Sequence, residues 1–419
     1  MLSADLCQEF ARELQHWKGA TEQLADLDSV ATPQAWLALE HYLGVSLREA
    51  LLTVVGRLRR MMCEFEGRLA ATSSDTDVEQ LQSRFAALRN AYLRAETTVD
   101  FYSDALVTRS IPRIGALLRA CDHIATRSMA EALTPMGREV PAACTYLDKG
   151  LGASVLKAGL RLWDGTAENP VSTIKVTRHN LLRPSSIIHE AGHQVAHMLG
   201  WTPEAARVLR GGLPSKTLGD LWAGWASEIV ADAFAHVHTG FAAVAALHDV
   251  LDGDNGAVFR YLPDDPHPVA YVRVLMAVEM CRRTFGGGPW DRLASAWIVK
   301  HPVDRSPDDI RALLEDSVRA LPRIVEILLY APYRAFGGRA LTWLINPARV
   351  SPAALAQLER DAGTTAFTSP YWAWNEAVRL LALTGFRAGL GPQQLREAVR
   401  QQERLMLRLG GGHSVSAVA

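Results

Sequence analysis

Hydrophobic residues in the first third of the chain recur every three or four positions, the spacing of one face of an α-helix. They follow this rhythm over 47–69 and again over 78–106, with a polar stretch at 72–77 between the two runs. Two such segments joined by a short polar loop predict an antiparallel helical hairpin. Another helix is expected over 112–133. These helices either pack on one another and on the rest of the protein, or form a coiled-coil arm that binds a partner.

The pattern changes after residue 135 and becomes typical of short strands. Residues 154–163 alternate in part between apolar and polar, and residues 171–178 (VSTIKVTR) are rich in β-branched side chains. Both features favour extended structure. We therefore predict two strands, joined as a hairpin through a long loop that includes Asn169 and Pro170.

The remaining chain is predicted to be helical. A helix is expected to begin near Ser185, and others to cover 218–239 and 268–285. After Pro307 the chain has the character of helices separated by Pro and Gly, and the glycines at 410–412 are expected to open a loose tail.

These elements predict a mainly α (α+β) fold in three parts. An N-terminal helical region with the hairpin would cover 1–135, and a domain with a small β-sheet would cover 136–300. A C-terminal helical region with the loose tail would cover 301–419. The chain's 419 residues exceed what one typical core supports, in agreement with this division.

Composition removes several classes of function. Lys and Arg number 44 against 45 Asp and Glu, so the chain is not built to coat nucleic acid. A membrane span is not expected, because no run of about 18 uncharged apolar residues occurs. The five cysteines are scattered without a CxxC pair, and the first residues lack the pattern of a signal peptide. We therefore expect a cytoplasmic protein with reduced thiols.

Histidine is the residue type that suggests chemistry. Seven of the thirteen histidines lie between residues 189 and 267. Among them, His189-Glu190-Ala191-Gly192-His193 is an HExxH sequence in a predicted helix. Residues four apart share a helix face, so both imidazoles can bind one metal ion. Glu190 lies beside that face, where it can accept a proton from a metal-bound water.

A catalytic zinc ion usually has a third protein ligand, and three candidates can be weighed. His197 lies about 12 Å along the helix from His189, too far to share one ion. Glu228 and Asp232 are four apart on another predicted helix, so one carboxylate can bind the metal while the other holds a ligand imidazole. Glu228 is the preferred ligand and Asp232 the alternative. His236 extends the same helix face.

The two motifs together, HEAGH and then EIVAD, resemble the gluzincin group of zinc metallopeptidases (HExxH…ExxxD). The resemblance implies that His189, His193 and Glu228 bind Zn²⁺. It also implies that Asp232 orients one of the ligand histidines.

A third segment, His267-Pro268 followed by Arg273, is an HPxxxxR sequence. It is similar to a segment of the CAAX-prenyl-protease-like family, whose members are commonly embedded in membranes. By resemblance, His267 would help to stabilise the tetrahedral intermediate, and Arg273 would orient the loop or the substrate. The likeness spans roughly 150–290 and implies a zincin-like domain, in which an extended peptide substrate pairs with the edge of the small sheet.

We therefore expect a zinc-dependent metallohydrolase, and specifically a peptidase that acts on a peptide or protein substrate with Glu190 as general base. The second hypothesis is a helical adaptor or assembly protein. Its N-terminal hairpin would bind a protein partner, and its zinc site would be structural or vestigial.

Overall fold

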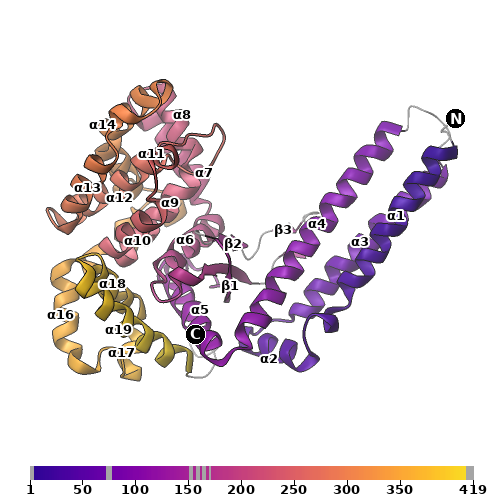
Figure 1. Cartoon of the computed structure of the whole chain (residues 1–419), viewed down its shortest axis with the longest axis horizontal. Helices are drawn as coiled ribbons and strands as arrows, with labels where there is room; N and C mark the ends of the chain where they lie inside the picture. The colour runs from indigo at the N-terminus through magenta and orange to yellow at the C-terminus, as the bar shows by residue number, and fades with distance from the viewer. Residues whose placement is uncertain are drawn as a thin grey trace.

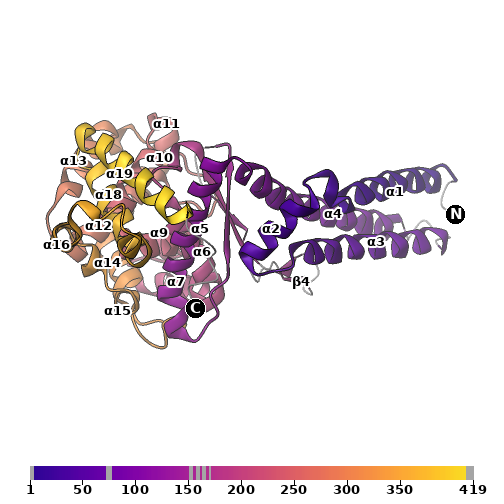
Figure 2. The same cartoon turned by 90° about the horizontal axis from the view of Figure 1, so that it is seen from below.

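The computed structural model describes residues 4–71, 78–150, 154–156, 161–162, 167–168 and 171–411. The fold is mainly helical with a small sheet, as predicted. A long helical arm extends from a larger helical body (Figures 1 and 2). The arm contains α1 (Ala4–Ala25), α2 (Pro33–Leu43), α3 (Leu47–Ala71) and α4 (Val78–Arg109). The body contains α5 (Pro112–Leu133), α6 (Ser185–Leu199), α7 (Trp201–Gly212), α8 (Lys216–Gly224), α9 (Ala226–Thr239), α10 (Phe241–Leu251), α11 (Asn255–Val258), α12 (Ala270–Phe285), α13 (Pro289–Lys300), α14 (Asp308–Tyr330), α15 (Leu341–Leu344), α16 (Pro352–Ala362), α17 (Pro370–Asn375), α18 (Ala377–Ala388) and α19 (Pro392–Gly411).

Three helices rather than two form the length of the arm. The predicted pair, α3 and α4, lies alongside α1, whose N-terminal end is at the free end of the arm (Figure 1). Near that end Phe10, Phe65 and Phe85, one from each helix, pack with ring centroids 5.3–5.9 Å apart. The apolar positions predicted from the 3–4 spacing thus form the arm's own core. The predicted loop at 72–77 lies outside the described residues.

The main sheet has the strand order β1 (Ala143–Asp148), β5 (Ser172–Thr177), β2 (Ser154–Leu156). The predicted strands at 154–163 and 171–178 pair antiparallel as β2 and β5. Within the first of them the structure also has β3 (Arg161–Leu162), which pairs with β4 (Ala167–Glu168). The predicted loop residues Asn169 and Pro170 lie outside the described residues. Strand β1, which the sequence pattern did not reveal, pairs parallel to β5.

The sheet lies between the arm and the body and is covered on both faces. Cys144 and Tyr146 of β1 pack with arm residues such as Tyr102. Ala143 and Leu147, on the opposite face, belong to the core of the body. Because both faces are buried, β1 lacks the apolar and polar alternation by which strands are predicted.

A buried ion pair fastens the arm to the body beside this sheet. Arg109 at the end of α4 donates to both carboxylate oxygens of Asp122 on α5, at 2.8 and 2.7 Å. The phenol of Tyr42 on α2 and the backbone N–H of Thr145 on β1 donate to the same carboxylate, at 2.9 and 2.6 Å. One fully buried side chain therefore links two arm helices, a body helix and the sheet.

The core of the body is continuous from Leu117 to Leu409. Helix α5 belongs to it and packs on α19, where Arg119 donates to the backbone oxygen of Gly410 at 2.7 Å. Helix α19 therefore continues through Gly410 and Gly411, where the beginning of a loose tail was expected, and residues 412–419 lie outside the described part. The domain boundaries at 135 and 300 stay a prediction.

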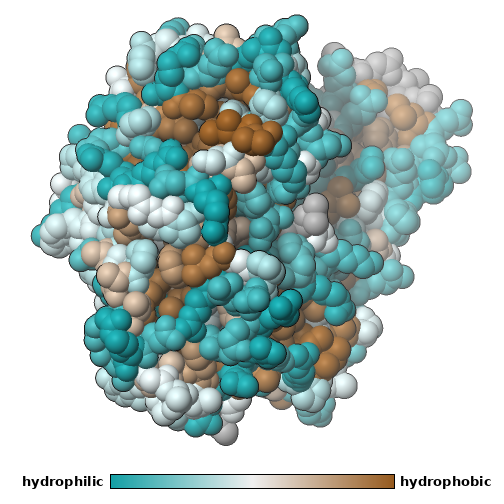
Figure 3. Space-filling view, turned by 60° about the vertical axis from the view of Figure 1, so that its left-hand side comes forward, coloured by the Kyte–Doolittle hydropathy of each residue, from teal (hydrophilic) through white to brown (hydrophobic). Residues whose placement is uncertain are grey.

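The helix predicted over 218–239 is in fact two helices, α8 and α9. They meet at Trp225, whose backbone leaves the helical conformation (φ −87°, ψ 2°) and whose ring packs against Trp222. Among the described helices, none has both the length and the apolar composition that crossing a membrane requires. On the face of the body in Figure 3, apolar residues gather in separate areas between hydrophilic ones.

Candidate metal centre

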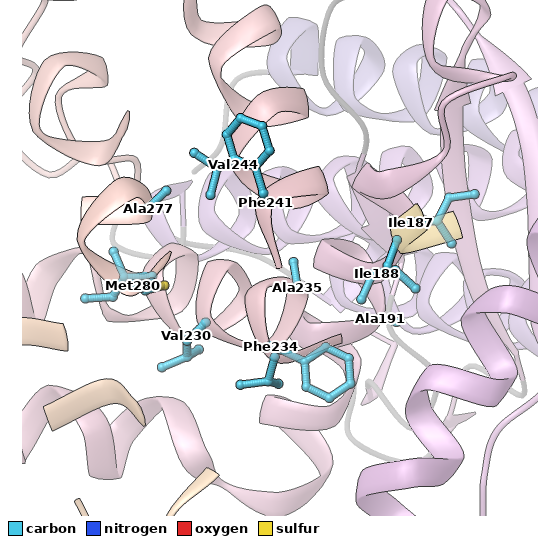
Figure 4. Close-up of a cluster of buried hydrophobic side chains, with 14 of the residues drawn as sticks. Ile187, Ile188, Ala191, Val230, Phe234, Ala235, Phe241, Val244, Ala277 and Met280 are labelled. Atoms are coloured by element: carbon cyan, nitrogen blue, oxygen red, sulfur yellow. The ribbon is translucent and has the colours of Figure 1, made fainter. Parts of the chain in front are cut away.

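Helices α6 and α9 carry the two sequence motifs, and they pack directly on each other. Buried Ile188 and Ala191 of α6 and Phe234 of α9 belong to the interface of these helices (Figure 4). At Gly192 the two backbones approach closely, since an added Cβ atom would lie 2.9 Å from Cβ of Phe234 and 3.1 Å from Cα of Ala231. The glycine of HEAGH thus allows the histidines of α6 to face the carboxylates of α9.

Three ligand atoms converge between these helices. Nε2 of His193 lies 3.1 Å from Nε2 of His189 and 3.3 Å from Oε1 of Glu228. Nε2 of His189 lies 3.4 Å from Oε2 of the same glutamate. In a tetrahedral site with metal–ligand distances of about 2.05 Å, ligand atoms are about 3.3 Å apart. The three side chains therefore have the spacing that a tetrahedral metal ion requires, with one coordination position left over.

Asp232 and Arg273 form hydrogen bonds with two of these three side chains and with each other. Oδ1 of Asp232 accepts from Nδ1 of His189 at 2.9 Å, so Nε2 is the nitrogen of His189 that a metal ion would bind in place of a proton. Arg273 on α12 donates to Asp232 at 2.7 and 2.9 Å and to Glu228 at 3.1 Å. Arg273 was expected to orient a loop or the substrate, and the structure instead places its guanidinium on the two carboxylates of the centre.

The charges of the centre are strongly coupled because the side chains are buried. Burial raises the pKa of Asp232, but Arg273 and His189 outweigh it and bring the pKa to about 2. Burial also opposes ionisation of Glu228, yet its contacts with both histidines and Arg273 hold its pKa below the usual range. For His189, burial lowers the pKa, while the two carboxylates raise it to about 10.

Glu190 follows His189 in α6. Like His189, His193 and Glu228, it lines a cavity. Its side chain is buried, and burial raises its pKa although His189 and His193 act in the opposite direction. With neutral imidazoles, the carboxylates of Glu190, Glu228 and Asp232 against the single guanidinium of Arg273 leave two net negative charges. A divalent cation would neutralise them.

His267 stands at the mouth of the centre, in the segment before α12. Its side chain is 60% exposed, and its Nε2 lies 3.7 Å from Oε2 of Glu228. Nδ1 lies 2.7 Å from Oδ1 of Asp265, which also accepts from the backbone N–H of His267 at 2.9 Å. The loop thus holds the imidazole close to Glu228, and the role predicted for His267 stays a prediction.

The other two histidines that were considered lie apart from the ligand group. His197 is exposed near the end of α6. His236 is buried in the cavity wall, 3.1 Å from the hydroxyl of Thr284, and burial lowers its pKa to about 3. Neither belongs to the three side chains that could hold a metal ion.

His189, His193 and Glu228 lie in a cavity of about 470 Å³. Its walls include Asn180 and Ser186, whose Nδ2 and Oγ atoms are buried without a hydrogen-bond partner. The sequence did not indicate a role for Asn180, because a single Asn between a predicted strand and a predicted helix has no distinguishing pattern. The only indication in the sequence was that Asn180 precedes His189 of the HExxH motif by nine residues.

The comparisons with known proteins add no relative. No protein-family model matches the chain, and neither the curated proteins nor the solved structures contain a match. What can be said of the function therefore rests on the geometry of the centre.

Proposed function

We propose that this protein is a zinc-dependent metallohydrolase of the gluzincin type, and that it hydrolyses peptide bonds. The observation that carries the proposal is the convergence of His189, His193 and Glu228 at tetrahedral spacing, with Glu190 on the same helix beside them. Two imidazoles and one carboxylate, with a position left open, form a common ligand set of catalytic zinc.

A bound zinc ion would polarise the substrate carbonyl and lower the pKa of its water. Glu190 accepts a proton from the attacking water and then passes it to the leaving amine. The water oxygen bonds to the carbonyl carbon, the C–N bond breaks, and one water is consumed for each acid and amine formed. A buried carboxylate with a raised pKa is suited to both proton transfers.

His267 would act on the carbonyl oxygen as negative charge develops there. Its Nδ1 faces the carboxylate of Asp265, which favours a proton on that nitrogen. Nε2 can then donate a hydrogen bond only when the ring is protonated on both nitrogens. In that form Nε2 would donate to the carbonyl oxygen.

The test combines metal analysis with peptide hydrolysis. Wild-type protein should contain one zinc ion and cleave members of a broad peptide library. Glu190→Gln should keep the metal and lose cleavage, whereas His193→Ala and Glu228→Ala should lose both. His197→Ala is the matched control, because this exposed histidine lies on the same helix, and it should change neither measurement.

The outcomes separate the alternatives. Retention of zinc by His193→Ala would show that the site is assigned wrongly. Loss of zinc from Asp232→Ala but not from Glu228→Ala would make Asp232 the third ligand. Stoichiometric iron in place of zinc would point to an oxygen-dependent reaction, since two histidines and one carboxylate also bind Fe(II).

The long helical arm favours a second candidate function, that of an adaptor or assembly protein with a structural zinc site. It has its own small cores, formed by helices α1, α3 and α4. Leu52 and Leu93 on its surface are 46% and 47% exposed. Wild-type protein that binds zinc but cleaves no library member, and that loses a bound partner when both leucines become Ser, would support this candidate.

A further inference from the structure

The cavity continues from the metal centre toward α10, and there its wall is apolar. Helix α10 contributes six apolar residues, which lie on one broad helix face: Ala243, Val244, Ala246, Leu247, Val250 and Leu251. Most of them are only half-buried, so this face is not fully covered by the body. Ala277 and Met280 of α12 complete the wall (Figure 4). We call this part of the cavity the α10 lobe.

The residues that form the α10 lobe are all uncharged. Among the described residues that line the cavity, every acidic or basic side chain belongs to the metal centre or is His236 or His267. The α10 lobe therefore disfavours a charged group, which would lose its hydration without gaining a partner. An apolar group of suitable size would gain from leaving water.

The cavity wall also contains a donor without an acceptor. Asn180 is 8% exposed, it lines the cavity, and its Nδ2 has no hydrogen-bond partner. A buried amide in this condition is unfavourable, and a ligand that supplies an acceptor removes the penalty. Asn180 lies just after β5 and just before α6, so two packed elements fix its position.

We propose that the metal centre acts on peptides in which a large apolar side chain flanks the scissile bond. That side chain occupies the α10 lobe, while Nδ2 of Asn180 donates a hydrogen bond to a backbone carbonyl of the same peptide. This inference rests on the proposed function. The cavity volume of about 470 Å³ falls in the range of small-ligand sites, so it accommodates a segment of a few residues rather than a folded partner.

Two peptide hydroxamates serve as probes, one with an isobutyl side chain and one with a hydroxymethyl side chain. Binding to zinc-loaded protein is measured by calorimetry. The isobutyl compound should bind roughly tenfold to a hundredfold more tightly, because a hydrophobic pocket discriminates to this degree. The peptide library should show the same preference beside the cleaved bond.

Leu247→Asn makes the lobe polar and should reduce the preference for the isobutyl compound severalfold, with the zinc content unchanged. Leu293→Asn is the matched control, because Leu293 is also half-buried but lies on α13 outside the cavity wall. Ala243→Leu is a second variant that fills the lobe instead. It should weaken the isobutyl compound and leave the hydroxymethyl compound unaffected.

Asn180→Asp keeps the shape of the side chain and removes the donor, and Asn180→Ala removes the whole amide. Both variants should bind each hydroxamate roughly threefold to tenfold more weakly. For a cleaved peptide, we expect KM to rise more than kcat falls. Unchanged affinity in both variants would remove Asn180 from the proposal.

Failure of this inference differs from failure of the proposed function. Equal binding of both hydroxamates by a protein that binds zinc and cleaves peptides would overturn the α10 lobe proposal and leave the peptidase intact. A protein that neither binds zinc nor cleaves any peptide would overturn the proposed function, and the inference with it.

Discussion

Replacing Asp232 by Asn tests whether the buried carboxylate holds His189 ready for a metal ion. The two side chains have the same shape, but Asn presents one oxygen and one NH₂ group. In the native protein Oδ1 accepts from His189 at 2.9 Å and from Nη2 of Arg273 at 2.9 Å. Oδ2 accepts from Nε of Arg273 at 2.7 Å. All three partners are donors, so an NH₂ group in either position faces an N–H.

Each orientation of the amide has a definite consequence. With its oxygen toward His189, the NH₂ group leaves Nε of the buried Arg273 without an acceptor, which costs about 1–3 kcal/mol of stability. With its NH₂ toward His189, the imidazole proton has to move to Nε2, the atom that should bind the metal. Loss of such an outer hydrogen bond typically weakens metal binding roughly 10- to 100-fold, or about 1.4–2.8 kcal/mol.

The assay is competition for zinc between the protein and a chromophoric chelator. Urea unfolding in excess chelator measures the stability change separately. Ser227→Ala is the matched control, since the Ser227 hydroxyl makes only a long contact, 3.4 Å, with Nδ1 of His193, the other histidine of the centre. The Ser227→Ala protein should lose less zinc affinity than the Asp232→Asn protein. An Asp232→Asn protein that is folded and binds zinc as tightly as wild type would refute the reasoning.

Three other predictions concern the framework around the centre. Gly192→Ala should destabilise the protein by about 1–3 kcal/mol in urea unfolding and also weaken zinc binding, because the new methyl group meets α9 at 2.9 Å; unchanged zinc affinity would contradict the close approach. Burial lowers the pKa of His238 from 6.5 to about 4. As the pH falls, the unfolded chain therefore takes up this proton before the folded protein does, and the free energy of unfolding should fall by roughly 3 kcal/mol between pH 6.5 and 4. His238→Gln should show a shallower pH dependence in unfolding experiments. Tyr42→Phe removes the 2.9 Å hydrogen bond to the Asp122 carboxylate and should lower the free energy of unfolding by about 1.5 kcal/mol, whereas no change would mean that this bond adds nothing at the junction.

Residues whose positions follow from helix geometry could be predicted from the sequence. His189 and His193 share a face because they are four apart, and Glu228 and Asp232 share a face for the same reason. The structure adds that these two faces meet, which depends on a long-range contact at Gly192. A glycine in a helix does not by itself indicate which other helix approaches it.

Other features left no periodic signal. Strand β1 is buried on both faces, so its side chains do not alternate. The HPxxxxR pattern placed Arg273 near the centre but could not indicate that its guanidinium binds the two carboxylates. Asn180 could not be identified, because an unpaired donor becomes evident only when its neighbours in space are known.

The contact between α5 and α19 has a consequence for the order in which the protein forms during synthesis. An added Cβ atom at Gly410 would overlap the backbone oxygen of Ala116, so the two helices touch backbone to backbone across almost 300 residues of chain. The arm helices, whose partners are near in sequence, can fold as soon as they leave the ribosome. Helix α5 emerges directly after them and can pack on β1 and α6, but the part of its surface that contacts α19 stays exposed until α19 has been synthesised. Chaperones that bind nascent apolar segments would be expected to act on α5.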